Sequence, residues 1–298
     1  MVPGGRPAGR FTIAMTAAAI LAALSASPAP AQTAASLDCG LEAGPSRAVA
    51  AVIDGDTLRL DDGKEVRLIG LIAPRAEDAG APRDSWPPEN ASRKALADRL
   101  AGRTVSLAFQ GPRSDRYGRV LAHVFFDEAG ASQWVQAAHL EAGHARAFAP
   151  PEHAACLPQL LAREKVARAA SRGLWANAAY QVRPADRPGE LVRYRGTFQL
   201  VAGRVAKVSG TRTLAILELA NSEAPAPETK AKEATSGGVV RDRAGFRVVW
   251  NRSAKTVAEV HGRRTGGLSG ADVLVRGWVE MRRGPEIEIH GATQLDVQ

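Results

Sequence analysis

The residues of this sequence best suited to chemistry are acids and arginines of the kind that handle phosphate. Asp54 and Asp56 flank a glycine, and at i and i+2 near the end of a strand their carboxylates point the same way. Arg67 follows in a second strand-like run, and Arg119 ends the segment Ser114-Asp-Arg-Tyr-Gly-Arg. Phosphodiester attack needs a divalent cation, a group that activates water, and cations where negative charge develops. Each motif alone is common at turns, but their combination predicts a phosphate site.

The elements that must position these residues form a small β-rich domain. Short β-rich runs meet at 61–63, an Asp-Gly hairpin signal, so residues 47–72 predict an antiparallel meander of three strands. Further segments are predicted as helices at 89–100, 132–142 and 152–170, and as strands at 104–109 and 119–126. This order fits a mainly β fold with helices (α+β), namely a five-stranded OB-type barrel with three helices.

The rest of the chain predicts a second, smaller domain. The first domain is placed at 32–178, a linker rich in Pro, Arg and Asp at 179–192, and the second domain at 193–298. Its strands are predicted at 197–208, 213–219, 246–250, 272–280 and 286–289, with a helix at 253–260. Five strands with one helix before the fourth favour another OB-like barrel, with a generic α+β sheet as the alternative.

Over about residues 48–176 the sequence resembles the staphylococcal nuclease (thermonuclease) family. The resemblance rests on a proline at position 74 and on five segments, which are Val-Ile-Asp-Gly-Asp-Thr at 52–57, Val-Arg-Leu-Ile-Gly-Leu at 66–71, Asp-Arg-Tyr-Gly-Arg at 115–119, Leu-Glu-Ala-Gly-His-Ala-Arg-Ala at 140–147 and Arg-Gly-Leu-Trp at 172–175. It implies an OB barrel with three helices that hydrolyses DNA and RNA with calcium. It also implies that Asp56 is a metal ligand, that Asp54 is its neighbour, and that Arg67 and Arg119 hold the phosphate. Tyr117 lies in the same motif and is a candidate nucleic-acid contact.

Two acidic positions of the family site are not acidic in this sequence. Ile72 stands where a second metal-binding aspartate would be, and Arg75 where the glutamate linked to water activation would be. Calcium needs several oxygen ligands, and a guanidinium repels the ion. The sequence therefore predicts that calcium binds weakly or not at all, with Asp56 as the main ligand and Asp54 as a weaker one.

Two loop acids just beyond, Glu77 and Asp78, are candidate replacements, although solvated loop acids are the simpler interpretation. Enzymatic activity is therefore left open. The leading hypothesis is an exported protein that binds nucleic acid or related phosphodiester polymers, with weak or lost hydrolysis. One alternative is a calcium-dependent secreted or periplasmic nuclease that uses Asp56 and a shifted loop carboxylate. Another is an envelope protein-interaction module.

The charge of the chain points to a polyanionic partner for its C-terminal part. The net charge is +8, and residues 32–178 are balanced, whereas residues 179–298 hold 19 basic against 13 acidic residues. This distribution predicts that DNA, RNA or another polyanion binds mainly through the C-terminal domain, with Arg282 and Arg283 in a hairpin turn as candidate contacts. Trp250 and Trp278 are stacking candidates, but a small barrel favours both as core residues.

Residues 1–31 read as a signal peptide, because arginines precede an apolar run at 11–26, and the small residues after this run end in Ala-Pro-Ala at 29–31. Cleavage would release the chain into the periplasm or outside the cell and would leave no stable membrane span. Cys39 and Cys156 survive cleavage, and an even cysteine count in an oxidising compartment predicts a disulfide between them.

Overall fold

The computed structural model describes residues 1, 37, 39–82, 85–211, 214–222, 245–251, 259–260 and 263–298. Apart from Met1, the predicted signal peptide lies outside these residues, and so do residues 253–258 of the predicted helix at 253–260. The described residues from 37 onwards belong to one compact unit. No helix in the described ranges is long and apolar enough to cross a membrane.

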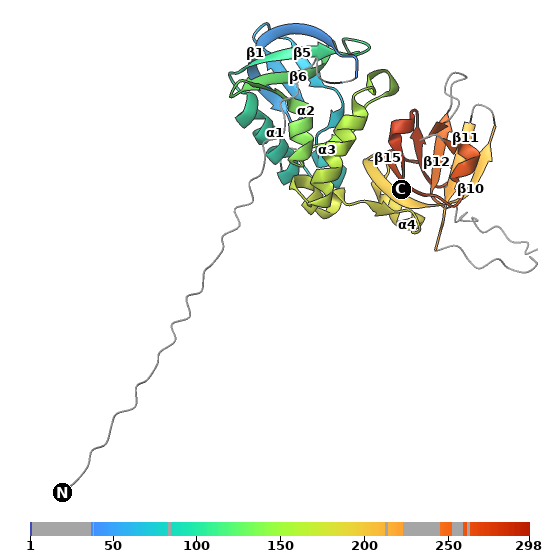
Figure 1. Ribbon diagram of the computed structural model, residues 1–298. Coiled ribbons are helices and arrows are strands. Elements are labelled where there is room, and N and C mark those ends of the chain that lie inside the picture. The colour runs from blue at the N-terminus through green and yellow to red at the C-terminus, as the bar shows by residue number, and fades with distance from the viewer. Residues whose placement is uncertain are drawn as a thin grey trace, which may run out of the picture. The chain divides into compact units, whose positions relative to one another are not determined.

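The first barrel has five strands and closes on itself (Figure 1). Its strands are β1 (Glu42–Asp54), β2 (Thr57–Leu60), β3 (Glu65–Leu68), β5 (Thr104–Phe109) and β6 (Val120–Glu128). They pair in the order β3-β2-β1-β5-β6, and a parallel pairing of β3 with β6 completes the ring. The hairpin predicted at 61–63 joins β2 to β3, and its Gly63 has a φ of 81°, which glycine adopts without strain. The predicted OB-type barrel is confirmed.

Of the three helices of the first barrel, the first begins two residues earlier than predicted and the other two begin later. They are α1 (Pro87–Leu100), α2 (Val135–Glu141) and α3 (Leu157–Ala169), and the segment before α3 forms a short 3-10 helix at Pro151–His153. The predicted helix at 132–142 starts as strand β7 (Ala131–Trp134), which pairs with β6. Trp134 is buried and stacks on Phe125 across that pair, so packing at the sheet edge overrides the helical pattern.

The second barrel also closes through five strands. These are β10 (Phe198–Gly210), β11 (Leu214–Leu219), β12 (Arg247–Asn251), β15 (Asp272–Met281) and β16 (Pro285–Ile289). They pair in the order β15-β16-β12-β11-β10, and β15 closes on β10. The prediction of a second β domain is confirmed. Where the sequence predicted the end of a helix, residues 259–260 form a strand, because they pair with the segment 263–264.

Short elements complete the fold. The strands are β4 (Leu71–Ile72), β8 (Arg146–Ala147), β9 (Arg183–Pro184), β13 (Glu259–Val260), β14 (Arg263–Arg264) and β17 (Leu295–Val297). The short helices are α4 (Pro188–Leu191) and 3-10 turns at Ala76–Ala79, Gly173–Ala176, Ala178–Tyr180, Val192–Tyr194, Thr265–Leu268 and Ala292–Gln294. The segment 179–192, predicted as a linker, thus carries structure of its own. Its strand β9 pairs with β10, and Tyr180 and Leu191 are buried, so this segment is packed.

Apolar side chains from both barrels share a third buried cluster. Trp175 and Tyr180 follow α3, whereas Phe198, Leu200 and Leu274 come from β10 and β15. The second barrel is therefore packed against the first through its β10–β15 face.

Two covalent or ionic links reinforce the packing. The predicted disulfide joins Cys39 to Cys156 at the start of α3, with Cα atoms 5.1 Å apart. Arg276 of β15 is buried against Glu164 of α3, with Nη1 and Oε1 2.9 Å apart. A buried ion pair of this kind fixes orientation, because either partner alone would be an uncompensated charge.

Candidate functional site

The turn between β1 and β2 places Asp54 and Asp56 side by side. Asp54 Oδ1 accepts the backbone N–H of Asp56 at 2.9 Å, which shapes the turn. A side chain on Gly55 would overlap the hydroxyl of Ser92 on α1, so only glycine lets the turn approach this helix. His139 of α2 lies 3.0 Å from the Ser92 hydroxyl and hydrogen-bonds the backbone of Gly55. Two helices therefore brace the acidic turn from behind.

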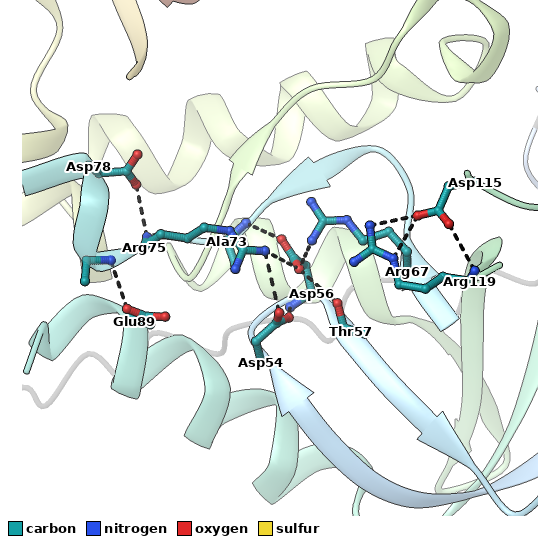
Figure 2. A network of polar contacts seen from close by, with 11 residues as sticks. Asp54, Asp56, Thr57, Arg67, Ala73, Arg75, Asp78, Glu89, Asp115 and Arg119 are labelled. Carbon is teal, nitrogen blue, oxygen red and sulfur yellow. Dashed lines mark hydrogen bonds and ion pairs between the residues drawn. The ribbon is translucent and has the colours of Figure 1, made fainter. Parts of the chain in front are cut away.

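Asp56 is fully buried and is held by donors on every side (Figure 2). Arg67 of β3 forms an ion pair with its Oδ1, and Nη2 of Arg75 lies 3.2 Å from the same oxygen. The other oxygen accepts the backbone N–H of Ala73 at 2.9 Å, and the Thr57 hydroxyl lies 3.3 Å from Oδ1. Two guanidinium groups and one amide thus compensate the buried carboxylate.

Arg75 turns inward across both aspartates. Its Nη2 is 3.5 Å from Asp54 Oδ2 as well as 3.2 Å from Asp56, so one guanidinium bridges the pair (Figure 2). Its backbone N–H donates to Asp78 Oδ2 at 3.0 Å, which fixes the start of the 3-10 turn. Glu89 of α1 accepts the N–H of Ala76 in the same turn at 2.9 Å. The residue at the family's glutamate position is therefore a cation placed over the acidic pair.

The donor set around this pair does not fit calcium. Calcium takes about six to eight oxygen ligands, and here the two adjacent carboxylates already face arginines. Within the described ranges, no group of three or more His, Cys, Asp and Glu residues could hold a metal ion. The structure brings the predicted ligands Asp54 and Asp56 together, but a guanidinium satisfies them.

The candidate replacement acids do not reach this pair. Asp78 forms an ion pair with Arg146 at 2.7 Å and accepts the Tyr180 hydroxyl at 3.2 Å. Glu77 lies on the same 3-10 turn and is exposed. Ile72 is half-buried and packs against the apolar cluster shared by the barrels. Asp78 is thus held in a structural ion pair with Arg146, which argues against its use as the shifted carboxylate.

The loop before β6 arranges a second arginine beside an aromatic ring. Asp115 accepts the backbone N–H groups of Tyr117 and Arg119 at 2.9 and 3.0 Å, and it pairs with the Arg119 guanidinium at 2.8 Å. Burial acts to raise the pKa of Asp115, but the bonds from Arg119 and Tyr117 lower that pKa overall. Tyr117 is 68% exposed, and the guanidinium groups of Arg116 and Arg119 lie 4.8 and 5.5 Å from its ring centre.

The guanidinium of Arg67 is buried close to other positive charges. Burial, together with the nearby positive charges of Arg75 and Arg119, lowers the pKa of Arg67 to about 10, although Asp54 acts in the opposite direction. Three guanidinium groups therefore lie close together in a partly dry site. A bound anion would relieve their mutual repulsion, which is the electrostatic condition for a phosphate site.

These arginines line a cavity of about 350 Å³. The charged lining residues are Arg67, Arg75, Asp78, Asp115, Arg119 and Arg146. The aromatic lining residues are Phe148, His153, Phe198 and Trp278. We did not identify Arg146, Phe148 or Phe198 as site residues from the sequence. Phe198 and Trp278 come from the second barrel, whose placement no local sequence pattern reveals.

The second barrel presents its predicted contacts in a different setting. Arg282 lies 2.8 Å from Glu280 and from Glu288, and 3.7 Å from Glu286, and these acids raise its pKa. Arg283 is exposed in the adjacent turn position. Three glutamates thus neutralise much of the charge that the hairpin was predicted to offer.

The two tryptophans of the second barrel differ from each other. Trp250 is a core residue, as predicted. Trp278 is 43% exposed, so the prediction of a core position is wrong for this residue. Trp278 is exposed because it lies on the side of β15 that faces the first barrel and the cavity, rather than the interior of the second barrel.

Comparison with known proteins supports the resemblance found in the sequence. Residues 65–177 match the family described as staphylococcal nuclease homologue. An uncharacterized protein of Bacillus anthracis is 31% identical over 133 residues, which cover 41% of this chain and 57% of that protein. The chain thus spans little more than half the length of this curated relative. The family match includes Arg67, Arg75 and Arg119 and begins after Asp54 and Asp56.

Proposed function

We propose that this chain, which carries a staphylococcal nuclease homologue domain at residues 65–177, binds nucleic acid or a related phosphodiester polymer without calcium-dependent hydrolysis. Domains of this kind are associated with nuclease activity and with nucleic-acid binding. The observation that carries the proposal is the bridge from Arg75 to Asp54 and Asp56. It keeps a positive charge at the centre of the site and removes the oxygen donors that a metal would need.

Arg75 can replace the charge of a metal but not its chemistry. A guanidinium stays protonated in proteins and has no acceptor, so it neither activates water nor acts as a general base. It can still offer hydrogen-bond donors to phosphate oxygens, as can Arg67 and Arg119. These residues therefore favour retention of a phosphodiester over its cleavage.

The proposal also assigns polyanion attraction to the second barrel and a periplasmic or secreted location to the protein. Residues 179–298 carry the positive excess of the chain, which would attract a polyanion over a distance. The apolar N-terminal run and the Cys39–Cys156 disulfide support delivery to the periplasm or the exterior, where disulfides persist.

The test uses the chain from Gln32 onwards with labelled single-stranded DNA and RNA, in calcium, in manganese and in chelator. We expect binding in chelator and no cleavage under any of these conditions. Arg119→Gln should weaken binding by about tenfold or more, because a hydrogen bond from a charged donor contributes about 1.5–3 kcal/mol. Arg59→Gln is the matched control, since it removes the same charge from β2 and from an exposed ion pair with Glu65.

Two outcomes would contradict the proposal. Metal-dependent cleavage that Asp56→Ala abolishes would establish the nuclease alternative. A complete lack of binding to DNA and RNA at low salt would leave the protein-interaction alternative.

A further inference from the structure

We propose that Trp278 and Phe148 form an aromatic wall that stacks on the terminal base of a single strand whose phosphate lies at Arg67 and Arg119. The inference rests on the proposed function and deepens it, because it specifies which part of the polymer is recognised. It also gives the second barrel a direct role at the arginine site.

The aromatic wall is built from rings that contact one another edge to face. The centres of Phe148 and Trp278 are 5.0 Å apart, with ring planes at 88°. Phe198 supports both from behind, at 5.1 Å from Trp278 and 5.4 Å from Phe148. Phe198 is buried, whereas Phe148 and Trp278 line the cavity that also holds Arg67 and Arg119.

Strand β15 holds Trp278 over the cavity. Arg276 and Trp278 lie two residues apart and therefore on the same face of the strand. Arg276 is fixed by Glu164 and by the carbonyl of Ala147 at 2.9 Å, both in the first barrel. Trp278 is paired in register with Phe198 on β10. The ring is thus anchored two residues from a buried ion pair, which preorganises it for stacking.

Two aromatic side chains at or beside this cavity are more exposed to solvent than the other aromatic side chains that the structure describes. Among the described Phe, Tyr and Trp side chains, only Tyr117 and Trp278 are largely exposed, at 68% and 43%. Trp278 lines the cavity, and Tyr117 lies under Arg119, which lines it too. Exposed rings beside clustered arginines are the arrangement by which proteins bind unpaired bases and their phosphates.

The cavity suits one nucleotide at an end better than the middle of a strand. Its volume of about 350 Å³ lies near the lower limit of small-molecule sites, about 300–1,000 Å³. Phe148 contacts Trp278, and Arg146 donates to the Phe198 carbonyl at 2.7 Å, so these contacts close the side between the barrels. In this proposal, the terminal nucleotide places its phosphate at the arginines and its base against this wall.

The experiment compares linear and covalently closed single strands of identical DNA sequence, in chelator and at moderate salt. We expect the chain from Gln32 onwards to bind the linear form at least tenfold more tightly. Trp278→Ala should lower affinity for the linear form roughly 5- to 150-fold, the range for loss of one base stack. It should leave affinity for the circle unchanged. Trp278→Phe should retain most of the linear affinity, and Val192→Ala, at an equally exposed apolar position, should change neither.

The outcomes separate this inference from the proposed function. Equal affinity for the linear and the covalently closed DNA, with no effect of Trp278→Ala, overturns the inference and leaves polymer binding intact. An equal loss for both forms overturns recognition of an end. Failure of the unaltered chain to bind either form overturns the proposed function itself. Retained linear affinity in Trp278→Phe shows that a loss in Trp278→Ala comes from the ring and not from misfolding.

Discussion

The guanidinium Nη2 of Arg75 lies 3.2 Å from Oδ1 of the buried Asp56. This contact places a guanidinium over the acidic pair, at the position where the family resemblance would put a glutamate linked to water activation. The buried acid is therefore compensated within the chain, and its charge does not depend on an added ion.

We predict that millimolar calcium will not raise the melting temperature of the unaltered chain. The double substitution Ile72→Asp and Arg75→Glu removes the competing guanidinium and adds two carboxylates, so it should create calcium-dependent stability. A gain of about 1.4 kcal/mol is expected if calcium is present at about ten times its dissociation constant. Thermal melts with calcium and with chelator provide the measurement. A calcium-dependent rise of several degrees in the unaltered chain would contradict the role given to Arg75.

We predict that the disulfide stabilises the chain strongly. Cys39 and Cys156 are 117 residues apart, and closing so long a loop contributes on the order of 4 kcal/mol under the chain-entropy model. The double substitution Cys39→Ser and Cys156→Ser should lower the free energy of unfolding by about that amount in urea titrations. Alkylation and mass measurement should find no free thiol in exported material. Two free thiols there would refute the bond.

Local patterns in the sequence predict most elements of both barrels. Strand β5 lies at 104–109 as predicted, and β11 and β16 begin within one residue of their predicted starts. One error is at Ser132–Trp134, where pairing with β6 overrides a helical pattern. Alternation and turn chemistry are local, whereas the choice at this position depends on a contact with a neighbouring strand.

The acidic and basic residues of the first domain were also identifiable, because their motifs are contiguous. What the sequence could not predict is where they point. Nothing local shows that Arg75 folds back over Asp54 and Asp56, or that Asp78 pairs with Arg146, since these contacts depend on the tertiary fold. The same holds for Trp278, whose exposure results from the packing of one barrel on the other.

We predict that mild acid destabilises the folded chain, because two of its buried histidines resist protonation. Burial lowers the pKa of His123 and of His139 to about 3, from an ordinary value near 6.5. The folded chain keeps both neutral, whereas the unfolded chain protonates them below pH 6.5. Their contribution is thus complete above that pH and is lost progressively as the pH falls toward 3. The slope should be about 1.4 kcal/mol per pH unit for each histidine.

Urea unfolding between pH 6.5 and 5 measures this slope, in a range where most carboxylates remain ionised. His123→Leu removes one titrating ring from an apolar setting beside Trp134, so it should lower the slope by about one histidine. An unchanged slope in this variant would show that His123 is protonated in the folded chain.

The hairpin between β15 and β16 allows a test of how the second barrel meets a polyanion. Arg282 is surrounded by three glutamates, whereas Arg283 is its exposed neighbour. We predict that Arg283→Gln reduces the slope of log affinity against log salt by about one, while Arg282→Gln changes it little. Titrations of single-stranded DNA at several salt concentrations compare the two variants. A larger effect of Arg282→Gln would show that its glutamate pairs open on binding.

The buried pair between Arg276 and Glu164 should hold the second barrel on the first. Arg276→Met would remove the paired charge of the buried Glu164 carboxylate and leave it the hydrogen bond from the backbone N–H of Ala147, at 2.6 Å, so stability should fall by about 3–5 kcal/mol. Adding Glu164→Leu should restore much of the loss, because an apolar pair of similar volume carries no uncompensated charge.

The matched control is Arg163→Met, which removes an α3 arginine from a partly exposed pair with Glu141 and should cost less than about 1 kcal/mol. Urea unfolding of the four proteins measures these differences. If Arg276→Met costs no more than Arg163→Met, the buried pair does not secure the barrel, and the position of Trp278 must depend on the shared apolar cluster alone.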